Sequence, residues 1–479
     1  MPSITLGRRE FRDKVFACWL GKNIGGTLGA PHECKRYALA LDFYDPVPTQ
    51  AAPNDDLDLQ LVWLKCLEDC GTDPPLPALA EYWSRYAAAY PWNEYGFFMR
   101  NYGRGLRPPV AGCFENYFVD EMGSPIRSEI WACMHAGDPQ SAARMAWKDS
   151  ALDHAGGEGT WGEMFWAALQ AAAFVESDPQ TLIRIGLSMI PLSSHVARSI
   201  REAVWCRGAG LAWGEARERI ASRFGHLQPC NAVPNHGFTI IGWLYGTDFG
   251  DRLLKAVNCG YDTDCTGATL GALLGILGGA KGIPDRWRKP VGTQIVLHKF
   301  TRGFAPPRTI DELAGRTVAL AETVAKAKAE VAFGPRTRLP KDLRTRLFRN
   351  GLAEAARRQD IHAAVELCGG REVSVHYGGE PVLRAGIGRE VSVTVDGRPA
   401  RVELAVPAGW TAKRLGPARF LLFSAGPVAD RNTITVKIGR ASVGFVMLGP
   451  GEAKGFPAGD NVPKCPKCQA RAEACICPK

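Results

Sequence analysis

No run of apolar residues in this sequence is long enough to cross a bilayer. The longest, Ala268–Ala280, is shorter than the about 20 residues that a membrane helix needs, and glycines interrupt it. Residues 1–10 also lack the basic segment and the apolar run of a secretory signal. We therefore expect a cytoplasmic protein with no membrane partner.

A disulfide pattern is lacking although cysteines are numerous. There are 15, an odd number, and several lie in stretches with helical periodicity, such as Cys66, Cys70 and Cys133. Disulfide scaffolds belong to secreted chains, so free thiols in a reducing compartment are the expected state.

Aromatic residues are scarce in the most basic part of the chain. The formal net charge is +9, and much of the excess lies between Arg336 and Arg358, where Phe348 is the single aromatic residue. A surface that stacks on nucleic-acid bases needs aromatic side chains among its basic ones. We interpret this segment as a solvated linker and helix face, and we expect no nucleic-acid partner.

Two kinds of periodicity divide the 479 residues. Apolar residues at three- and four-residue spacing predict an all-α domain over residues 1–332. A basic linker with a helix at Leu343–Cys368 is expected within residues 333–370. Period-two alternation then predicts an all-β, Ig-like sandwich over residues 371–450. Its expected strands lie at 373–377, 391–395, 402–406, 420–422, 434–438 and 445–447.

The segment V-P-A-G-W at Val406–Trp410 resembles a strand-end signature of Ig-like domains found beside carbohydrate-active enzymes. The match covers one turn, so two interpretations of the sandwich stay open: it binds a ligand, or it only packs on the helical domain.

The tail, residues 451–479, contains Cys465, Cys468, Cys475 and Cys477. Four thiolates can hold a structural Zn²⁺ ion, although the C-x-C pair and the short middle gap are unusual for a zinc ribbon. A zinc site and a thiol-bearing tail without metal both stay open.

Two acidic clusters, Asp55-Asp56 and Asp262-x-Asp264, each follow a loop and precede an apolar helix. Helix capping is the simplest interpretation of either cluster. However, the second cluster lies among apolar residues and glycines, where unpaired carboxylates are costly to bury. Convergent carboxylates need a cation, and oxygen ligands suit Mg²⁺, Mn²⁺ or Ca²⁺ better than Zn²⁺.

Glycines follow the second cluster at four-residue spacing, at positions 267, 271, 275 and 279. They form one stripe along a helix. Since such a stripe lets another helix approach closely, we predict a central, buried helix there.

The helical part resembles the ADP-ribosylglycohydrolase family, which includes the dinitrogenase reductase-activating glycohydrolase. Four stretches carry the resemblance, in the family's order, over about residues 10–290. The most specific is V-N-C-G-Y-D-T-D at Val257–Asp264, followed by I-P-D-R-W at Ile283–Trp287. The others are A-C-W-L-G at Ala17–Gly21 with G-A-P-H-E at Gly29–Glu33, N-D-D at Asn54–Asp56, and the segment from Gly137 to His154.

The resemblance implies an orthogonal all-α fold with one or two Mg²⁺ ions, which Mn²⁺ or Ca²⁺ could replace. Its substrate would be ADP-ribose, free or attached to protein, or a related glycoside. Carried over by position, the metal ligands would be Asn54, Asp55, Asp56, Asp262, Asp264 and Cys265, with Thr266 as a substitute for Cys265. The catalytic residues would be Asp56, Asp264 and Glu33, and the substrate-binding residues His154, Asp153 and Arg127. Tyr261 is a further candidate for substrate binding because it lies beside the aspartates in the sequence.

The sequence departs from the family pattern at several of these positions. Gly26 stands where the family usually has aspartate, Asn54 and Asp153 where it has threonine, and Cys265 where it has a hydroxyl. An asparagine still offers an oxygen, whereas a thiol is a poor ligand for a hard ion. These departures put the substrate in more doubt than the metal.

The resulting hypothesis is a metal-dependent glycosidase. Cleaving a ribosyl bond develops positive charge at the anomeric carbon, and a metal can orient the sugar and activate water. One of the three catalytic acids would relay the proton, and Trp92 or Tyr102 could stack on a base or sugar. Two alternatives stay open: a hydrolase of another furanoside or nucleoside-like glycoside, and an ADP-ribose-binding protein without turnover.

Overall fold

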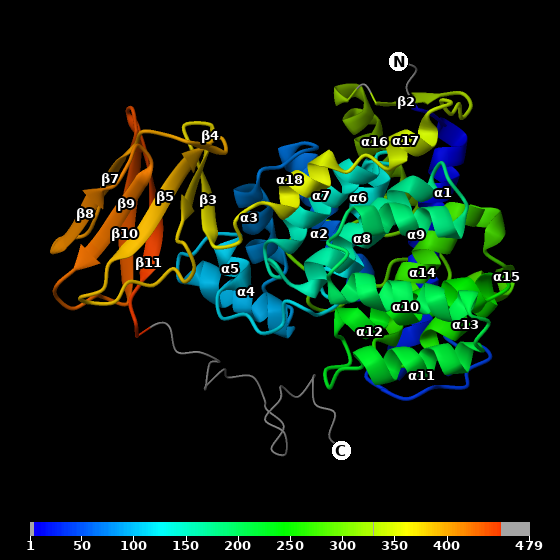
Figure 1. Cartoon of the computed structure of the whole chain (residues 1–479). Helices are drawn as coiled ribbons and strands as arrows, with labels where there is room; N and C mark the ends of the chain where they lie inside the picture. The colour runs from blue at the N-terminus through cyan, green and yellow to red at the C-terminus, as the bar shows by residue number, and fades with distance from the viewer. Residues whose placement is uncertain (1–3, 329, 452–479) are drawn as a thin grey trace.

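Helices follow the three- and four-residue apolar spacing of the first two thirds of the chain. The computed structural model describes residues 4–328 and 330–451, with a helical part and a β part at opposite ends (Figure 1). The helices of the helical part are α1 (Arg8–Gly29), α2 (Asp55–Cys70), α3 (Leu76–Tyr86), α4 (Asn93–Gly103), α5 (Val110–Cys113), α6 (Ser128–Met134), α7 (Pro139–Ser150), α8 (Glu158–Ala173), α9 (Pro179–Ser188), α10 (His195–Gly208), α11 (Trp213–Phe224), α12 (Ala232–Tyr245), α13 (Phe249–Val257), α14 (Thr263–Gly278), α15 (Asp285–Val291) and α16 (Ile310–Ala327).

The predicted close approach at the glycine stripe of α14 is confirmed, and its partner is α1. A Cβ built on Gly267, Gly271 or Gly275 would collide with the backbone of α1. The matching residues of α1 include Gly21 and Gly25, so the two backbones touch without side chains between them. This packing fixes the N-terminal end of α14 relative to α1.

One short pair of strands interrupts the helical pattern. β1 (Ile4–Gly7) runs parallel to β2 (Val331–Gly334), so the two ends of the helical part are joined. Each strand has four residues, too few for a clear alternation of apolar and polar residues. The two strands are more than 300 residues apart in the sequence, and local sequence patterns do not reveal such pairing.

Two antiparallel sheets form the β part, as the alternation predicts. One has the order β3-β4-β5-β9-β8, with β6 beside β5, and the other the order β11-β10-β7. Most of the alternate apolar residues that predicted the strands are buried, among them Val375, Val393, Val436 and Phe445, whereas Leu404, Val406 and Ile438 are half-buried. The strands are β3 (Ala363–Cys368), β4 (Arg371–His376), β5 (Arg389–Val395), β6 (Arg398–Pro399), β7 (Glu403–Ala405), β8 (Trp410–Arg414), β9 (Arg419–Ser424), β10 (Arg431–Ile438) and β11 (Ala441–Leu448).

The predicted helix Leu343–Cys368 is wrong at its C-terminal end. Two short helices, α17 (Leu343–Leu347) and α18 (Gly351–Arg357), are followed by strand β3. The sequence of β3, A-A-V-E-L-C, suits a helix, but pairing with β4 across the Gly369-Gly370 turn overrides this local preference. Both glycines have positive φ, which that tight turn requires.

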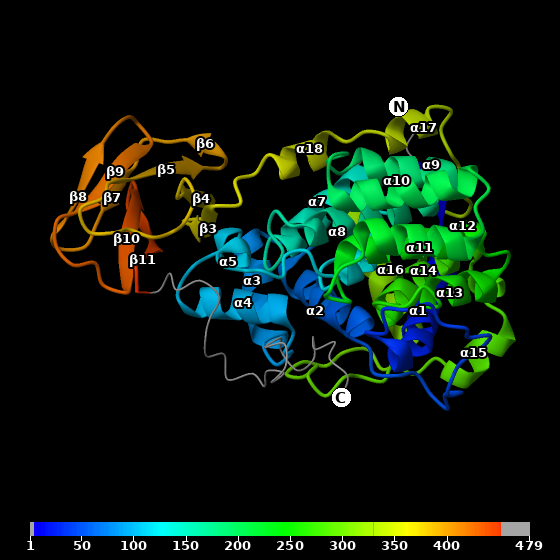
Figure 2. The same ribbon diagram turned by 60° about the horizontal axis from the view of Figure 1, so that its bottom comes forward.

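The β part packs on the segment that follows α4. Val365 N donates to Pro108 O at 3.0 Å, and Cys113 Sγ lies 3.3 Å from Ile361 O. Arg107 forms an ion pair with Glu366. These contacts place the sheets against the α4–α5 region of the helical part. Figure 2 shows α18 in the connection between the two parts.

The cysteines of residues 4–328 and 330–451 are all free thiols. Within the same residues, no helix combines the length and the apolar character that crossing a membrane requires.

Candidate metal centre and substrate cleft

A cleft opens where the N-terminal ends of α2 and α14 meet the turn after α1. Its cavity volume is about 310 Å³, within the range of about 300–1,000 Å³ that is typical of ligand pockets. Acidic side chains from separate segments converge on it. Its lining includes Glu33, Cys34, Asp55, Trp92, Glu94, Glu121, Cys230, Asp262, Asp264 and Cys265.

The turn after α1 brings Glu33 to the start of α14. Cys34 N donates to Tyr261 O at 2.8 Å, and Tyr261 N donates to Lys35 O at 2.7 Å. Tyr261 has a φ of 70°, in the left-handed region that non-glycine residues rarely adopt. The paired turn therefore holds Tyr261 in a strained conformation and places Glu33 beside Asp262.

Asn54 caps α2, and its position explains two departures from the family pattern together. Its side-chain oxygen accepts a hydrogen bond from Asp56 N at 2.8 Å. A Cβ on Gly26 would collide with the side-chain amide nitrogen of Asn54. The asparagine at position 54 therefore fills the space that the glycine at position 26 leaves open. Because the oxygen already serves the helix cap, metal ligation by Asn54 stays a prediction.

Asp262 occupies the N-cap position of α14 but makes no capping hydrogen bond. Both of its side-chain oxygens are buried without a hydrogen-bond partner, as is Oδ1 of Asp264. Burial raises the pKa of both carboxyls well above the ordinary value. Repulsion from Asp264 adds to the effect at Asp262, and repulsion from Glu33 adds to it at Asp264. Capping, the simplest interpretation from sequence, therefore does not account for Asp262.

Three groups of three side chains could each hold a metal ion. One joins Glu33 to the thiols of Cys34 and Cys230, and the other two, called here the first and the second group, share Asp264. In the first, one ligand atom each from Glu33, Asp262 and Asp264 lies within 4.8 Å of the others. In the second, the same holds for Asp56, Asp264 and Cys265. The first group consists of carboxylates only, the ligands that Mg²⁺, Mn²⁺ and Ca²⁺ prefer. The orphaned oxygens of Asp262 and Asp264 fit a bound divalent ion.

Glu33 lies in the open part of the cleft, where water reaches it. The surrounding cleft walls still remove much of its hydration, and this desolvation raises the pKa of Glu33 to about 8. Cys34 and the carboxylates of Asp55 and Asp56 raise it further. Cys34 Sγ and Cys230 Sγ lie 3.9 and 3.8 Å from Glu33 Oε1. Two thiols thus flank the carboxyl group at the cleft wall.

A fully buried lysine adjoins the second group. Lys22 Nζ lies 3.7 Å from Asp56 Oδ1 and 3.0 Å from Glu129 Oε2, and all three side chains have no exposed surface. Burial opposes the charged form of Lys22, but the charges of Glu129 and Asp56 outweigh it and raise its pKa. No sequence motif marked Lys22 as a site residue, although a lysine at the end of the apolar run A-C-W-L-G-K is a visible signal.

The other wall of the cleft supplies residues that no sequence motif marked. Glu94, at the start of α4, is 6% exposed, and burial raises its pKa to about 7. Glu121 is buried beside it, with Oε2 unpartnered. Trp92 Nε1 donates to Asp55 Oδ2 at 2.5 Å, so the indole is fixed against the acidic cluster.

Three predicted substrate-binding residues do not line the cleft. Arg127, Asp153 and His154 are fully buried. The guanidinium of Arg127 binds both carboxylate oxygens of Asp153, at 3.1 and 3.0 Å, and also Asp149 at 2.8 Å. His154 Nδ1 lies 2.6 Å from Asp153 Oδ1. Contact of these three residues with substrate stays a prediction. In the structure they are buried behind the residues that line the cleft.

Two further predicted residues point elsewhere. Tyr261 packs on Phe238, with ring centroids 5.2 Å apart, and does not line the cleft. The hydroxyl of Thr266 donates to Thr263 O at 3.2 Å, back along its own helix, and none of the three-ligand groups includes it. Of the two aromatic residues expected to stack on a base or sugar, Trp92 lines the cleft, whereas Tyr102 lies near the C-terminal end of α4, with its ring under Arg107. The four tail cysteines lie outside the described residues.

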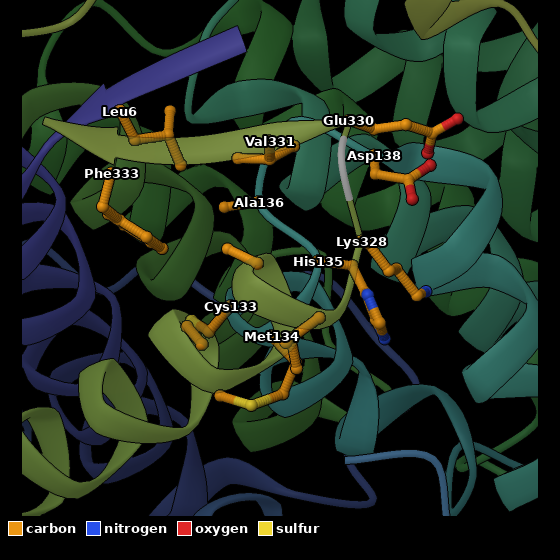
Figure 3. A pocket seen from close by; sticks show the side chains of 13 residues that line it. Leu6, Cys133, Met134, His135, Ala136, Asp138, Lys328, Glu330, Val331 and Phe333 are labelled. Carbon is orange, nitrogen blue, oxygen red and sulfur yellow. The ribbon is translucent and has the colours of Figure 1, made fainter. Parts of the chain in front are cut away.

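A second cavity, shown in Figure 3, lies between β2, α16 and the C-terminal end of α6. Its volume of about 20 Å³ is room for about one water molecule. His135 and Lys328 point into it (Figure 3). It is too small for a sugar, so the acidic cleft is the better candidate for substrate.

Residues 8–330 match the family model for ADP-ribosylglycohydrolase, and the protein therefore belongs to the ADP-ribosylglycohydrolase family. The family implies a hydrolase and generally binds divalent metal ions. A solved structure titled "ADP-ribosylglycohydrolase-related protein complex" is similar, with 19% identity and a TM-score of 0.44, covering 66% of this chain and 99% of that chain. No curated protein matched the sequence.

Proposed function

We propose that this protein is a metal-dependent glycosidase that cleaves the bond at the anomeric carbon of ADP-ribose or a ribose-like sugar. The observation that carries the proposal is the group Glu33, Asp262 and Asp264. Their three carboxylates converge within 4.8 Å in an open cleft, and within the described residues none of them forms an ion pair with a basic side chain. Acids arranged in this way need a bound cation.

Glu33, Asp262 and Asp264 would hold the ion, with Asp55 at the cleft edge as a further oxygen donor. Carboxylate ligands favour Mg²⁺, with Mn²⁺ or Ca²⁺ as substitutes. When bound, such an ion supplies a Lewis acid that orients sugar hydroxyls and lowers the pKa of water.

Two carboxyl groups on different walls of the cleft are suited to proton transfer. Glu33 is the one of the three expected catalytic acids that cleft water reaches, since Asp56 is fully buried and Asp264 is 8% exposed. Glu94 faces it from the start of α4 with a pKa of about 7, close to the value that general acid–base catalysis favours at neutral pH. We assign proton transfer to Glu33 and protonation of the departing oxygen to Glu94.

Trp92 gives the cleft an aromatic wall. Its ring is held by the hydrogen bond to Asp55 and by edge contacts with Tyr90 and Phe300. A fixed indole can stack on a nucleobase or on the apolar face of a sugar. This supports a substrate that carries a base, as ADP-ribose does.

A second candidate function is hydrolysis of a different furanoside or nucleoside-like glycoside. The thiol of Cys265 favours it, because this side chain lines the cleft where the family usually has a hydroxyl.

A substrate panel separates the two functions. ADP-ribosyl-arginine, an ADP-ribosylated peptide, inosine and a nitrophenyl arabinofuranoside would each be incubated with Mg²⁺ and the purified chain, and products measured by mass spectrometry. Release of ADP-ribose that EDTA abolishes supports the first function. Cleavage of the plain glycosides alone supports the second, and no turnover of any substrate by Mg²⁺-loaded protein contradicts both.

A further inference from the structure

We propose that Lys22 takes the place of a second metal ion, so that this chain holds one divalent ion, bound by Glu33, Asp262 and Asp264. The inference rests on the metal-dependent function proposed above and adds the number of ions to it. Four observations carry it: the position of Lys22, the network that fixes it, the ligands of the second group, and the charge balance of the first.

Lys22 presents its ammonium group to the acids of the second group. Its Nζ lies 3.7 Å from Asp56 Oδ1. A divalent ion bound to Asp56 on this side would lie against a positive charge in a region without water. Like charges at such distances repel strongly where water is excluded.

The ammonium group cannot easily move away, because its second partner is fixed. Glu129 Oε2 accepts a hydrogen bond from Gln60 Nε2 at 2.9 Å, and Glu129 Oε1 accepts one from Gln170 Nε2 at 3.0 Å. Gln60 Oε1 in turn accepts from Ile130 N at 2.7 Å. All these side chains are buried, so the network holds Glu129, and with it Lys22, in one place.

The second group is also poor in ligands for a hard ion. Its members are Asp56, Asp264 and the sulfur of Cys265. Asp56 forms an ion pair with Lys22, which Glu129 shares, so Asp264 is the one carboxylate of this group without a basic partner among the described residues. A single free carboxylate and a thiol do not make a site for Mg²⁺.

The first group has the opposite character. Among residues 4–328 and 330–451, no lysine, arginine or histidine pairs with Glu33, Asp262 or Asp264, while Lys22 pairs with Asp56. The two groups therefore differ in how their charge is neutralised. In the second group Lys22 supplies a positive charge, whereas the first group must take up a cation from solution.

The test counts ions on the full chain. Protein stripped with a chelator is titrated with Mn²⁺, which oxygen ligands bind, and free Mn²⁺ is followed by electron paramagnetic resonance alongside calorimetry. We expect one tight ion per chain and no spin-coupled manganese pair. Asp262→Asn should weaken this ion at least tenfold, whereas Asp56→Asn should change its affinity less than about threefold.

The double variant Lys22→Met with Cys265→Thr should bind two ions per chain and show the coupled spectrum. Its matched control is Lys148→Met with Cys265→Thr, because Lys148 is also a largely buried, paired lysine, bound to Asp73 at 2.8 Å outside the cleft. The control should bind one ion. If the double variant does not fold, the wild-type stoichiometry still decides.

Two tight ions on the wild type would overturn the inference and leave the proposed function standing. One ion on the folded double variant would also overturn it. No tight ion on the wild type would contradict the proposed metal dependence itself, so the two failures are distinguishable.

Discussion

Gly25 of α1 lies against Gly267 of α14 so closely that a Cβ on either residue would collide with the carbonyl oxygen of the other. This contact lies about one helical turn from the acids of the cleft, since Asp264 is in the first turn of α14, three residues before Gly267. The distance between the two helices therefore decides whether Glu33, Asp262 and Asp264 converge.

Gly25→Ala should separate α1 from α14. We expect the free energy of unfolding to fall by at least about 1–3 kcal/mol, the usual cost of overpacking, because the colliding atoms are backbone atoms that cannot rotate away. Chemical denaturation measures this, and Mn²⁺ affinity should fall in the same variant. Gly278→Ala, on the same stripe-bearing helix but with open space around its Cβ, is the control and should be neutral or slightly stabilising. Equal effects at both positions would show that the close contact is not decisive.

Trp92→Ala should weaken binding of ADP-ribose. Stacking of an aromatic side chain on a base contributes about 1–3 kcal/mol, which corresponds to about 5- to 150-fold in Kd. Trp92→Phe keeps a ring but removes the hydrogen bond to Asp55, so a smaller loss is expected. Calorimetric titration measures both, and Trp205→Ala, which removes a half-exposed tryptophan outside the cleft, is the control. An unchanged Kd in Trp92→Ala would exclude stacking on this residue.

The stability of the metal-free protein should fall as the pH rises from about 4.5 to about 8. Within this window the folded chain keeps a proton on Glu33, whose pKa is about 8, while the unfolded chain has released it at the ordinary value of 4.5. The folded state therefore binds more protons, and raising the pH favours unfolding. Cleft water screens Glu33, so the loss is smaller than the full difference in pKa implies.

Urea denaturation of the metal-free protein at several pH values measures this decline. In Glu33→Gln the decline should be shallower, since the amide does not titrate. Saturating Mg²⁺ should restore stability at pH 8, because the ion replaces the proton. Identical pH profiles for Glu33→Gln and the wild type would assign the decline to other buried acids.

Arg127→Met should destabilise the fold. The substitution leaves Asp149 and Asp153 buried without their counter-ion, and breaking a buried pair in this way costs about 3–5 kcal/mol. Arg144→Met, which breaks a partly exposed pair with Asp73, should cost about 0–1 kcal/mol. Denaturation curves compare the two. A normally stable Arg127→Met protein with a raised KM would instead support the predicted substrate contact.

Much of the fold could be predicted from sequence because its elements carry local patterns. The glycine stripe of α14 and the alternating strands β4, β5, β7, β9, β10 and β11 each show a periodicity that is visible over a few residues, whereas β6 and β8 were not predicted. The strands β1, β2 and β3 could not be predicted in the same way. Their pairing depends on partners remote in sequence or on a turn whose glycines override a helical composition.

The candidate site was predicted in part. Asp262 and Asp264 could be found because unpaired acids in an apolar context are conspicuous, and the family resemblance gave Glu33 its place. Lys22 is conspicuous in the sequence as a lysine in an apolar run. Its ion pair with Asp56 could not be predicted, because this contact depends on how α1 packs against α2. Glu94 is an acid in the first turn of a helix, a position that capping explains equally well, so only the structure places it in the cleft.

Calorimetric titration of ADP-ribose into the full chain, with Mg²⁺ and then with EDTA, tests the account most directly. We predict binding with a micromolar Kd in Mg²⁺ that Asp262→Asn weakens at least tenfold and EDTA abolishes. Equal binding with and without the ion, or no binding by protein shown to hold its ion, would contradict a metal centre that receives ADP-ribose.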